Sequence, residues 1–290
     1  TAPGTGLPTL DLRAHLVSVQ VVLADGQTVR AAGTASSGPT ALGNLFVGSR
    51  GLLGVITEVT LRPTAPPDRT VALVAFDDPA VAGNAALELF FAAPSVEAQL
   101  LSRVTLSDPT SLAPGEGAVL LVSCSADDRR AVEDVGMAFG ARQITVCPSG
   151  PDALLLLGAS ASAPAALRAL GVSLGDPLAV PPTRLADFLD GVREIERDCG
   201  HQVISLVDVG IGAVQAFVLD ADTATDTAEE SLARLLDLAC DLVQEATGAG
   251  NGRYSTAWTG RVLGGRFVES DRRMKLGLDP DGRLNPGLAY

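Results

Sequence analysis

The chain contains 290 residues, of which 47% are hydrophobic and 19% are charged, a composition that excludes disorder as the main state. Its formal net charge of -13 repels phosphate backbones and anionic lipids, so we expect no nucleic-acid partner. No apolar run reaches the roughly 18 to 20 residues of a membrane-spanning helix, so we expect no membrane span.

The four cysteines are too few for a disulfide scaffold, and none belongs to a C-x-x-C pair. We expect all of them to be buried, reduced thiols: Cys124, Cys147, Cys199 and Cys240. No signal peptide is visible, and together these features favour a cytoplasmic protein. The chain begins at Thr1, as a processed chain, a trimmed chain or a fragment would.

The first part of the chain predicts strands and turns. Residues 1–14 are rich in Pro, Gly and Thr and are expected to be irregular. Strands are expected over 16–23, 28–30 and 55–61, with a turn at 24–26 between the first two. A loop is expected over 33–44, and the prolines between 63 and 67 mark a boundary.

From about residue 69, strands and helices alternate. Asp78 can cap a helix that starts at Pro79, where a missing N–H costs nothing, and that runs to about Ala92. The other elements expected in this stretch are strands over 70–76, 97–106, 118–123 and 143–146, and a helix over 128–139.

The second half continues the alternation. Apolar residues at helical spacing predict a helix over 185–199: Leu185, Phe188, Leu189, Val192, Ile195 and Cys199. Strands are expected over 203–207 and 213–219, and Thr227 with Glu230 forms a capping box that starts another helix. The tail from Gly248 is glycine-rich. We therefore predict an α+β fold, with antiparallel sheets covered by helices on one face.

The most informative segment is 48–57, which reads Gly-Ser-Arg-Gly-Leu-Leu-Gly-Val-Ile-Thr. Its three glycines permit positive φ angles and close approach of another group to the backbone. The N–H groups of such a loop can face an anion. The alternative is an ordinary glycine-rich turn between strands, which the pattern alone favours.

Residues 45–58 resemble the Leu-Phe-Val-Gly-Ser-Glu-Gly-Thr-Leu-Gly-Val-Ile-Thr-Glu signature of FAD-linked oxidases. These enzymes form the D-lactate dehydrogenase and glycolate oxidase branch of the vanillyl-alcohol oxidase superfamily. Three further segments resemble motifs of the same family, in the same order. They are the strand and turn at 21–26, the helix start Val-Pro-Pro-Thr-Arg-Leu at 180–185, and Leu-Asp-Pro-Asp-Gly-Arg-Leu-Asn-Pro-Gly at 278–287.

The resemblance implies FAD as the cofactor and a small-molecule substrate, a 2-hydroxy acid such as lactate or glycolate or a related alcohol. It implies a second part of the FAD-binding domain at 1–67, a ferredoxin-like cap (substrate) domain at 68–248, and a tail at 249–290 that returns to the FAD domain. It implies that FAD contacts the glycine loop and the tail: Gly48, Ser49, Gly51, Gly54, Val55, Ile56 and Asn285. The family's pyrophosphate-binding subdomain would precede residue 1, so this subdomain or an electron-transfer subunit is an expected partner.

Several residues of the family's motifs are replaced in this chain. Arg50 stands where the loop has Glu, and residues 39–42 are Pro-Thr-Ala-Leu where the family has Gly-Tyr-Asp-Leu. The family's Gly-His-x-Gly-Asp-Gly-Asn-x-His segment, which supplies metal-binding or catalytic histidines, aligns with 207–215, where both histidines are absent. The family's Glu-His-Gly has no clear counterpart in 252–260.

These replacements matter because oxidation of a 2-hydroxy acid needs a base within hydrogen-bond reach of the substrate. The histidines of this chain are His15 and His201, and we expect His201 at the surface. Asp208 is the carboxylate in the right neighbourhood, although it also fits a turn residue at the end of a strand. No cluster has metal-ligand spacing. Three residues near the tail suit either carboxylate binding or a solvated loop: Arg253, Tyr254 and Arg261.

The sequence therefore leaves two main hypotheses. The chain is the C-terminal part of an FAD-dependent oxidoreductase, or it is a degenerate, non-catalytic subunit or interaction partner of a flavoenzyme complex. A third hypothesis, an oxidase that uses a different base and a different alcohol, also stays open.

Overall fold

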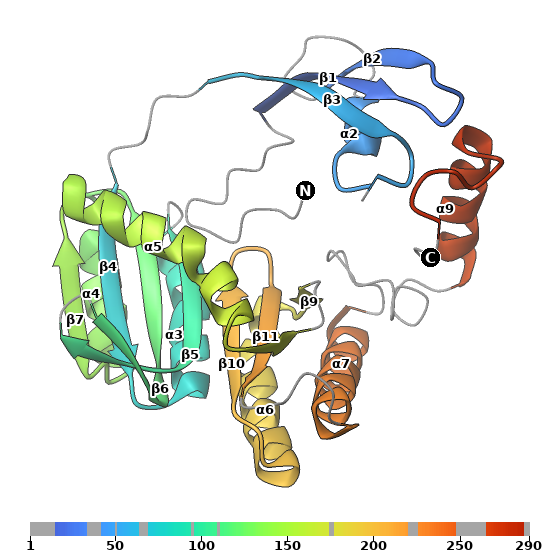
Figure 1. Ribbon diagram of the computed structural model, residues 1–290. Helices are drawn as coiled ribbons and strands as arrows, with labels where there is room; N and C mark the ends of the chain where they lie inside the picture. Colours follow the sequence, from blue (N-terminus) through green and yellow to red (C-terminus); the bar gives the residue numbers. More distant parts are fainter. Residues whose placement is uncertain are drawn as a thin grey trace. The chain divides into compact units, whose positions relative to one another are not determined.

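The computed structural model describes residues 15–33, 42–49, 51–63, 69–93, 96–108, 111–173, 177–219, 226–247 and 265–286. These residues belong to two compact units, which we treat separately. The small unit comprises the described residues of 15–63 and 265–286, and the sheet unit comprises those of 69–247. Figure 1 labels the helices and strands of both. The segment 1–14, which we predicted to be irregular, lies outside the described residues.

The small unit is built on an antiparallel sheet of strand order β2-β1-β3. Its strands are β1 (Leu16–Val22), β2 (Thr28–Ala32) and β3 (Val55–Leu61). The predicted hairpin is confirmed, since Val22 pairs with Thr28 and Gly26 in the turn has a φ of 85°. Two helices were not predicted: α2 (Gly43–Phe46) falls at the end of the expected loop, and α9 (Gly265–Leu278) in the glycine-rich tail.

One face of the small sheet carries the core of its unit. The buried side chains come from the strands, from α2 and from the segment between α2 and β3: Leu16, Val19, Val21, Ala31, Phe46, Leu52 and Leu53. Leu278, at the end of α9, packs against the same cluster. The C-terminal segment therefore shares a core with strands from the other end of the sequence.

The sheet unit contains a larger antiparallel sheet of order β7-β4-β6-β5-β10-β11-β8, with β9 paired to β11. Its strands are β4 (Thr70–Phe76), β5 (Glu97–Asp108), β6 (Ser111–Cys124), β7 (Gln143–Cys147), β8 (Gly171–Ser173), β9 (Leu178–Ala179), β10 (Val203–Asp208) and β11 (Ala213–Leu219). The first part follows the order β4-α3-β5-β6-α4-β7, with α3 (Pro79–Ala92) and α4 (Arg129–Ala138). This βαββαβ arrangement is ferredoxin-like, as predicted.

The helices cover both faces of the large sheet. Helices α3 and α4 lie on one face, and α5 (Pro151–Arg168) crosses the other (Figure 1). The prediction that helices cover one face alone was therefore wrong. Helix α5 was missed because it is apolar or small nearly all round and contains Pro164, so no helical period stands out.

The predicted helix starts and faces are largely confirmed. Asp78 caps α3, since its Oδ1 accepts hydrogen bonds from the N–H groups of Ala80 (2.7 Å) and Val81 (3.4 Å). The predicted apolar face of α6 (Leu185–Cys199) is buried except at Cys199, which is half-buried. Helix α7 (Asp226–Thr247) begins one residue before Thr227, so Thr227 lies inside the helix and is not its N-cap.

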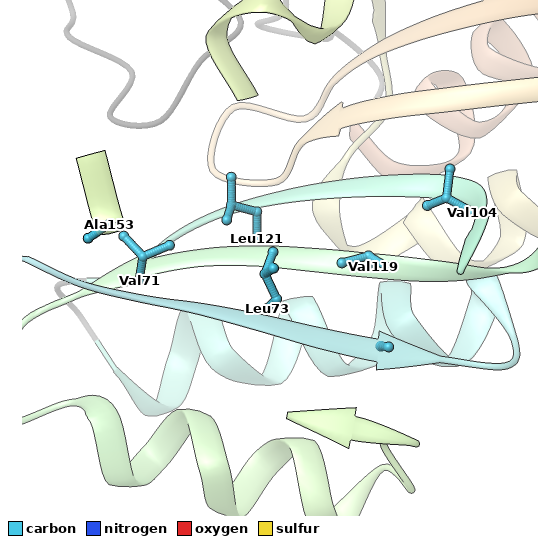
Figure 2. Close-up of a cluster of buried hydrophobic side chains, with 7 residues drawn as sticks. Val71, Leu73, Val104, Val119, Leu121 and Ala153 are labelled. Atoms are coloured by element: carbon cyan, nitrogen blue, oxygen red, sulfur yellow. The ribbon is translucent and has the colours of Figure 1, made fainter. Parts of the chain in front are cut away.

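A cluster of buried aliphatic side chains joins β4, β5 and β6 to the first turn of α5 (Figure 2): Val71, Leu73, Ala75, Val104, Val119, Leu121 and Ala153. Alternate residues of β4 and of β6 point to this face, as the two-residue period of a strand requires. Each Val or Leu buried in this way contributes about 1.5–3 kcal/mol to stability.

All four cysteines are free thiols. Cys124 and Cys240 are buried as predicted, whereas Cys147 and Cys199 are only half-buried. In the described part of the chain, no helix combines the length and hydropathy needed to cross a bilayer.

Candidate functional site

The predicted cofactor loop connects α2 to β3 in the small unit. Gly48 and Gly51 have φ angles of 83° and 72°, which other residues adopt only with strain. The turns are tight: Ser49 donates from both its N–H (3.2 Å) and its Oγ (2.9 Å) to the carbonyl of Phe46. The N–H of Leu52 then donates to the carbonyl of Ser49 at 2.9 Å. The glycines at 48 and 51 are therefore required by the backbone itself.

The end of the loop is anchored in the core. Leu52 and Leu53 are buried, and Gly54 lies so close to β1 that a Cβ there would be 2.3 Å from Cγ1 of Val21. Ile56 packs against the same core, whereas the side chain of Val55 is about half exposed (52%). Val55, unlike Ile56, is therefore available for contact with another group.

The C-terminal segment brings Asn285 to this loop. Asn285 has a φ of 44°, a left-handed conformation that Asn tolerates better than most residues. A Cβ added to Gly51 would lie 3.0 Å from Nδ2 of Asn285. Two residues that the family resemblance assigned to one cofactor site, from opposite ends of the sequence, are thus neighbours in the fold.

A buried lysine joins the loop to the C-terminal segment. The Nζ of Lys275, on α9, donates to the carbonyl of Leu52 (2.7 Å), to the carbonyl of Leu284 (2.8 Å) and to a carboxylate oxygen of Asp279. Asp279 is fully buried and also accepts from the N–H groups of Arg283 (2.9 Å) and Leu284 (2.8 Å). The hydrogen bond from Lys275, helped by these backbone donors, lowers the pKa of Asp279 to about 2. Asp279 is therefore ionised at neutral pH, and its charge is balanced by Lys275.

This geometry fits a flat, polar cofactor such as a flavin. Because Gly51 has no Cβ, the Asn285 amide can lie directly against the loop backbone and form one polar surface with it. The positive φ angles at 48 and 51 turn the backbone sharply, and the N–H groups of Ser49 and Leu52 donate within the loop itself. The individual cofactor contacts assigned to Gly48, Ser49, Gly51, Gly54, Val55, Ile56 and Asn285 stay predictions.

The sheet unit holds a second group of polar residues, on the face that α5 crosses. Asp208 on β10 pairs directly with Gln99 on β5, and both are buried. Ser160 of α5 donates its hydroxyl hydrogen to Oε1 of Gln99. Gln215 on β11 pairs with Leu206, two residues before Asp208, and so lies on the same face. Its Oε1 is buried without a hydrogen-bond partner in the part of the chain that the structure describes.

The turn that follows Asp208 is held in place by Val180, the residue after β9. Gly212 has a φ of 63°, and a Cβ there would lie 2.2 Å from the carbonyl oxygen of Val180. The N–H of Val180 donates to the carbonyl of Gly212 at 2.7 Å. The Val-Pro-Pro-Thr-Arg segment and the 207–215 segment, recognised separately in the sequence, therefore lie together in the fold.

In the sheet unit, His201 precedes β10, whereas Asp208 lies at the far end of that strand. His15 precedes β1 in the small unit, where its carbonyl accepts from the N–H of Arg62. His201 is half-buried between α6 and β10, where it lines a surface cavity of about 430 Å³ with Arg103 and Glu196. Among the described residues, no three His, Cys, Asp or Glu side chains could together hold a metal ion. Arg253, Tyr254 and Arg261 lie outside the described residues.

Comparison with protein families identifies the class. Residues 65–288 match the family described as FAD linked oxidases, C-terminal domain. Because this match covers most of the chain, the chain belongs to that family. The mixed α+β fold, with its large antiparallel sheet, agrees with this assignment.

Two individual relatives are similar to this chain over nearly its whole length. The chain is 27% identical over 288 residues to D-lactate dehydrogenase of Archaeoglobus fulgidus, covering 95% of this chain and 64% of that protein. It is 23% identical to glycolate oxidase subunit GlcD of Bacillus subtilis, covering 96% of this chain and 63% of that protein. The chain thus spans slightly less than two thirds of the length of these relatives.

Solved structures support the fold. The 4-ethylphenol oxidase from Gulosibacter chungangensis superimposes with a TM-score of 0.62, at 19% identity, over 96% of this chain and 66% of that one. A Physcomitrella patens BBE-like 1 variant gives a TM-score of 0.65 at 14% identity, over 96% of this chain and 66% of that one. At such identities the likeness concerns the fold alone.

Proposed function

We propose that this chain is the C-terminal portion of a flavin-dependent oxidoreductase that oxidises a 2-hydroxy acid, such as lactate or glycolate, or a related alcohol. We assign 1–67 and the tail at 249–290 to the FAD-binding domain, and 68–248 to the cap that receives the substrate. The observation that carries the proposal is the meeting of the glycine loop with Asn285, joined through Lys275. The names of the D-lactate dehydrogenase and GlcD relatives support the substrate class.

In this proposal the chain binds FAD through the backbone of the glycine loop and through the side chain of Asn285. FAD, when bound, supplies a two-electron acceptor for the oxidation. In the cap, Gln99 and Gln215 offer amide groups to a polar substrate. Asp208 is the carboxylate that would accept the proton of the substrate's hydroxyl, because the aligned segment 207–215 contains no histidine. Asp208 and Gln215 occupy the two positions where the family motif has histidines.

The alternative is a non-catalytic subunit of a flavoenzyme complex. Two observations favour it: both histidines of the family motif are replaced, and the polar residues of the cap are buried beneath α5. A relative is itself named as a subunit of glycolate oxidase. An N-terminal FAD subdomain or an electron-transfer subunit stays a proposed partner, and the cytoplasmic location stays a prediction.

The first experiment is a visible absorbance scan of the full-length product of the gene that encodes this chain. Flavin absorbance that bleaches anaerobically with D-lactate or glycolate supports the oxidoreductase. A protein that stays colourless after incubation with FAD contradicts the proposal. A flavoprotein that none of a panel of 2-hydroxy acids and alcohols bleaches favours the non-catalytic subunit.

A matched pair of variants tests the role of Asp208. In the proposal, Asp208→Asn removes the proton acceptor and slows bleaching by about 100-fold or more. Asp190→Asn makes the same chemical change at a largely exposed side chain of α6 and should leave the rate unchanged. Equal rates in the two variants would rule out Asp208 as the base.

A further inference from the structure

Lys275 is the single lysine of the chain, and it is buried. An ammonium group has three N–H donors and no acceptor, and here each donor has a partner: the carbonyls of Leu52 and Leu284 and the carboxylate of Asp279. A buried ammonium is tolerated only when it is paired and fully hydrogen-bonded. The surroundings of Lys275 are therefore built for a charged lysine at this position.

The two carbonyl partners come from the two segments that make up the candidate cofactor site. Leu52 follows Gly51 in the loop, and Leu284 precedes Asn285 in the C-terminal segment. The carbonyl of Leu284 shares a planar peptide unit with the N and Cα of Asn285, whereas the carbonyl of Leu52 belongs to the unit that follows Leu52, one residue beyond Gly51. A single ammonium group therefore holds together the two segments that carry Gly51 and Asn285.

The carboxylate partner extends this control into the C-terminal segment. Asp279 lies one helical turn after Lys275 and accepts from the N–H groups of Arg283 and Leu284. It thereby holds the turn that leads to Asn285. A planar guanidinium at position 275 could not place three donors as the compact ammonium does, since its donors form a fixed fork.

We infer that Lys275 is a positioning residue for the flavin: it ties the glycine loop to the C-terminal segment and so sets the Asn285 amide against Gly51 on the cofactor surface. The inference rests on the proposed function for the identity of the cofactor. The contacts of Lys275 within the small unit do not depend on it. Lys275 and Asp279 form a hydrogen-bond network with Leu52 at one end and Leu284 at the other. A change at one end of this network should alter the structure at the other end, and with it the affinity for FAD.

The test uses the full-length gene product and four variants: Lys275→Met, Asp279→Asn, the double variant of both, and Arg273→Met. Arg273 is an exposed residue of the same helix, paired only with Glu269 among the described residues, so it controls for loss of a cation from α9. Hydrogen exchange of the Leu52 and Leu284 amides reports the two ends of the network. Fluorescence titration gives the dissociation constant for FAD, and urea unfolding gives the stability.

We expect Lys275→Met to speed exchange at both amides and to weaken FAD binding at least ten-fold. Asp279→Asn should speed exchange at Leu52, although Asp279 does not itself contact the loop among the described residues. The double variant should recover much of the stability lost in Lys275→Met, because it leaves no unpaired buried charge. It should not recover FAD affinity, and the absorbance spectrum of its bound FAD should differ from that of the wild type. Arg273→Met should match the wild type in every measurement.

Two results would overturn the inference. One is a double variant whose FAD affinity returns together with its stability, which would make Lys275 a purely structural residue. The other is an Asp279→Asn variant with unchanged exchange at Leu52. A wild-type protein that binds no FAD would instead overturn the proposed function and leave no cofactor for Lys275 to position. The wild-type titration therefore separates failure of the proposed function from failure of this inference.

Discussion

In the small unit, a few directional polar contacts hold the candidate site, with Lys275 and Asp279 joining segments from opposite ends of the sequence. In the sheet unit, β4 is buried on both faces and is mostly Val, Leu and Ala, and β10 buries four aliphatic residues together with Ser205 and Asp208. The free energy gained by burying apolar area is non-directional and changes little with small displacements. A buried charge, in contrast, loses its stabilisation when one of its hydrogen-bond partners moves. The small unit is thus suited to fixing a cofactor surface, and the sheet unit to supplying a stable scaffold.

The substitution that we expect to lower stability most tests the apolar core of the sheet unit. Phe217→Ala, at a fully buried position on β11, should cost about 3–5 kcal/mol of unfolding free energy, because it removes apolar contacts and leaves a cavity. Phe91→Ala makes the same change on α3 at a side chain that is 68% exposed, and should cost less than about 0.5 kcal/mol. Denaturant unfolding followed by circular dichroism measures both. Similar losses of unfolding free energy in the two variants would show that burial of apolar side chains does not stabilise the sheet unit.

A second substitution tests the close packing of the glycine loop. Gly54→Ala should cost about 1–3 kcal/mol, because its Cβ would overlap Cγ1 of Val21 in the core of the small unit. Gly277→Ala, on α9, meets no atom within 4 Å and should be neutral or slightly stabilising, since Ala is the better helix former. Thermal unfolding of the two variants provides the comparison. A tolerated Gly54→Ala would show that the loop can move away from β1.

A third pair of variants measures how much the N-cap of α3 contributes to the stability of the sheet unit. Asp78→Ala should cost about 1 kcal/mol through loss of the cap of α3. Asp77→Ala is the control, because Asp77 is exposed and, like Asp78, pairs with an arginine. Losing that exposed ion pair alone should cost well under about 1 kcal/mol. If both variants lose the same stability in urea, the cap makes no separate contribution.

The last comparison concerns the pH dependence of stability in the two units. The pKa of Asp279 falls from an ordinary value of 3.8 to about 2, so its stabilisation is complete above about pH 4 and is lost as the pH falls through about 2. Burial raises the pKa of Glu97 in the sheet unit above its ordinary 4.5, although Arg69 opposes this shift. As the pH falls through the raised pKa of Glu97, the folded form takes up a proton first, and the sheet unit gains stability.

Urea midpoints measured against pH test this difference. Asp279→Asn should flatten the fall in stability between about pH 4 and pH 2, and Glu97→Gln should flatten the gain at higher pH. Unchanged pH profiles in both variants would show that neither carboxyl group contributes to the pH dependence.

Local sequence signals predicted most strands and the capped start of α3. The runs that form β1, β3 and β4 contain β-branched and apolar residues bounded by Gly or Pro, which favour strands whatever they later pair with. Helix α5 escaped prediction because its residues carry no amphipathic period, and only packing against the sheet defines its buried side. The glycine loop and Asn285 were singled out by resemblance to a family, not by periodicity.

The antiparallel α+β class, the glycines that allow the loop its turns, and the family resemblance can all be read from the sequence. Three contacts appear only in the folded chain: Asn285 lies against Gly51, Gln99 and Asp208 share the face that α5 crosses, and Lys275 meets Leu52. The reason is physical. Strand and turn preferences act over a few residues, whereas these contacts join distant segments whose meeting depends on how the whole core packs.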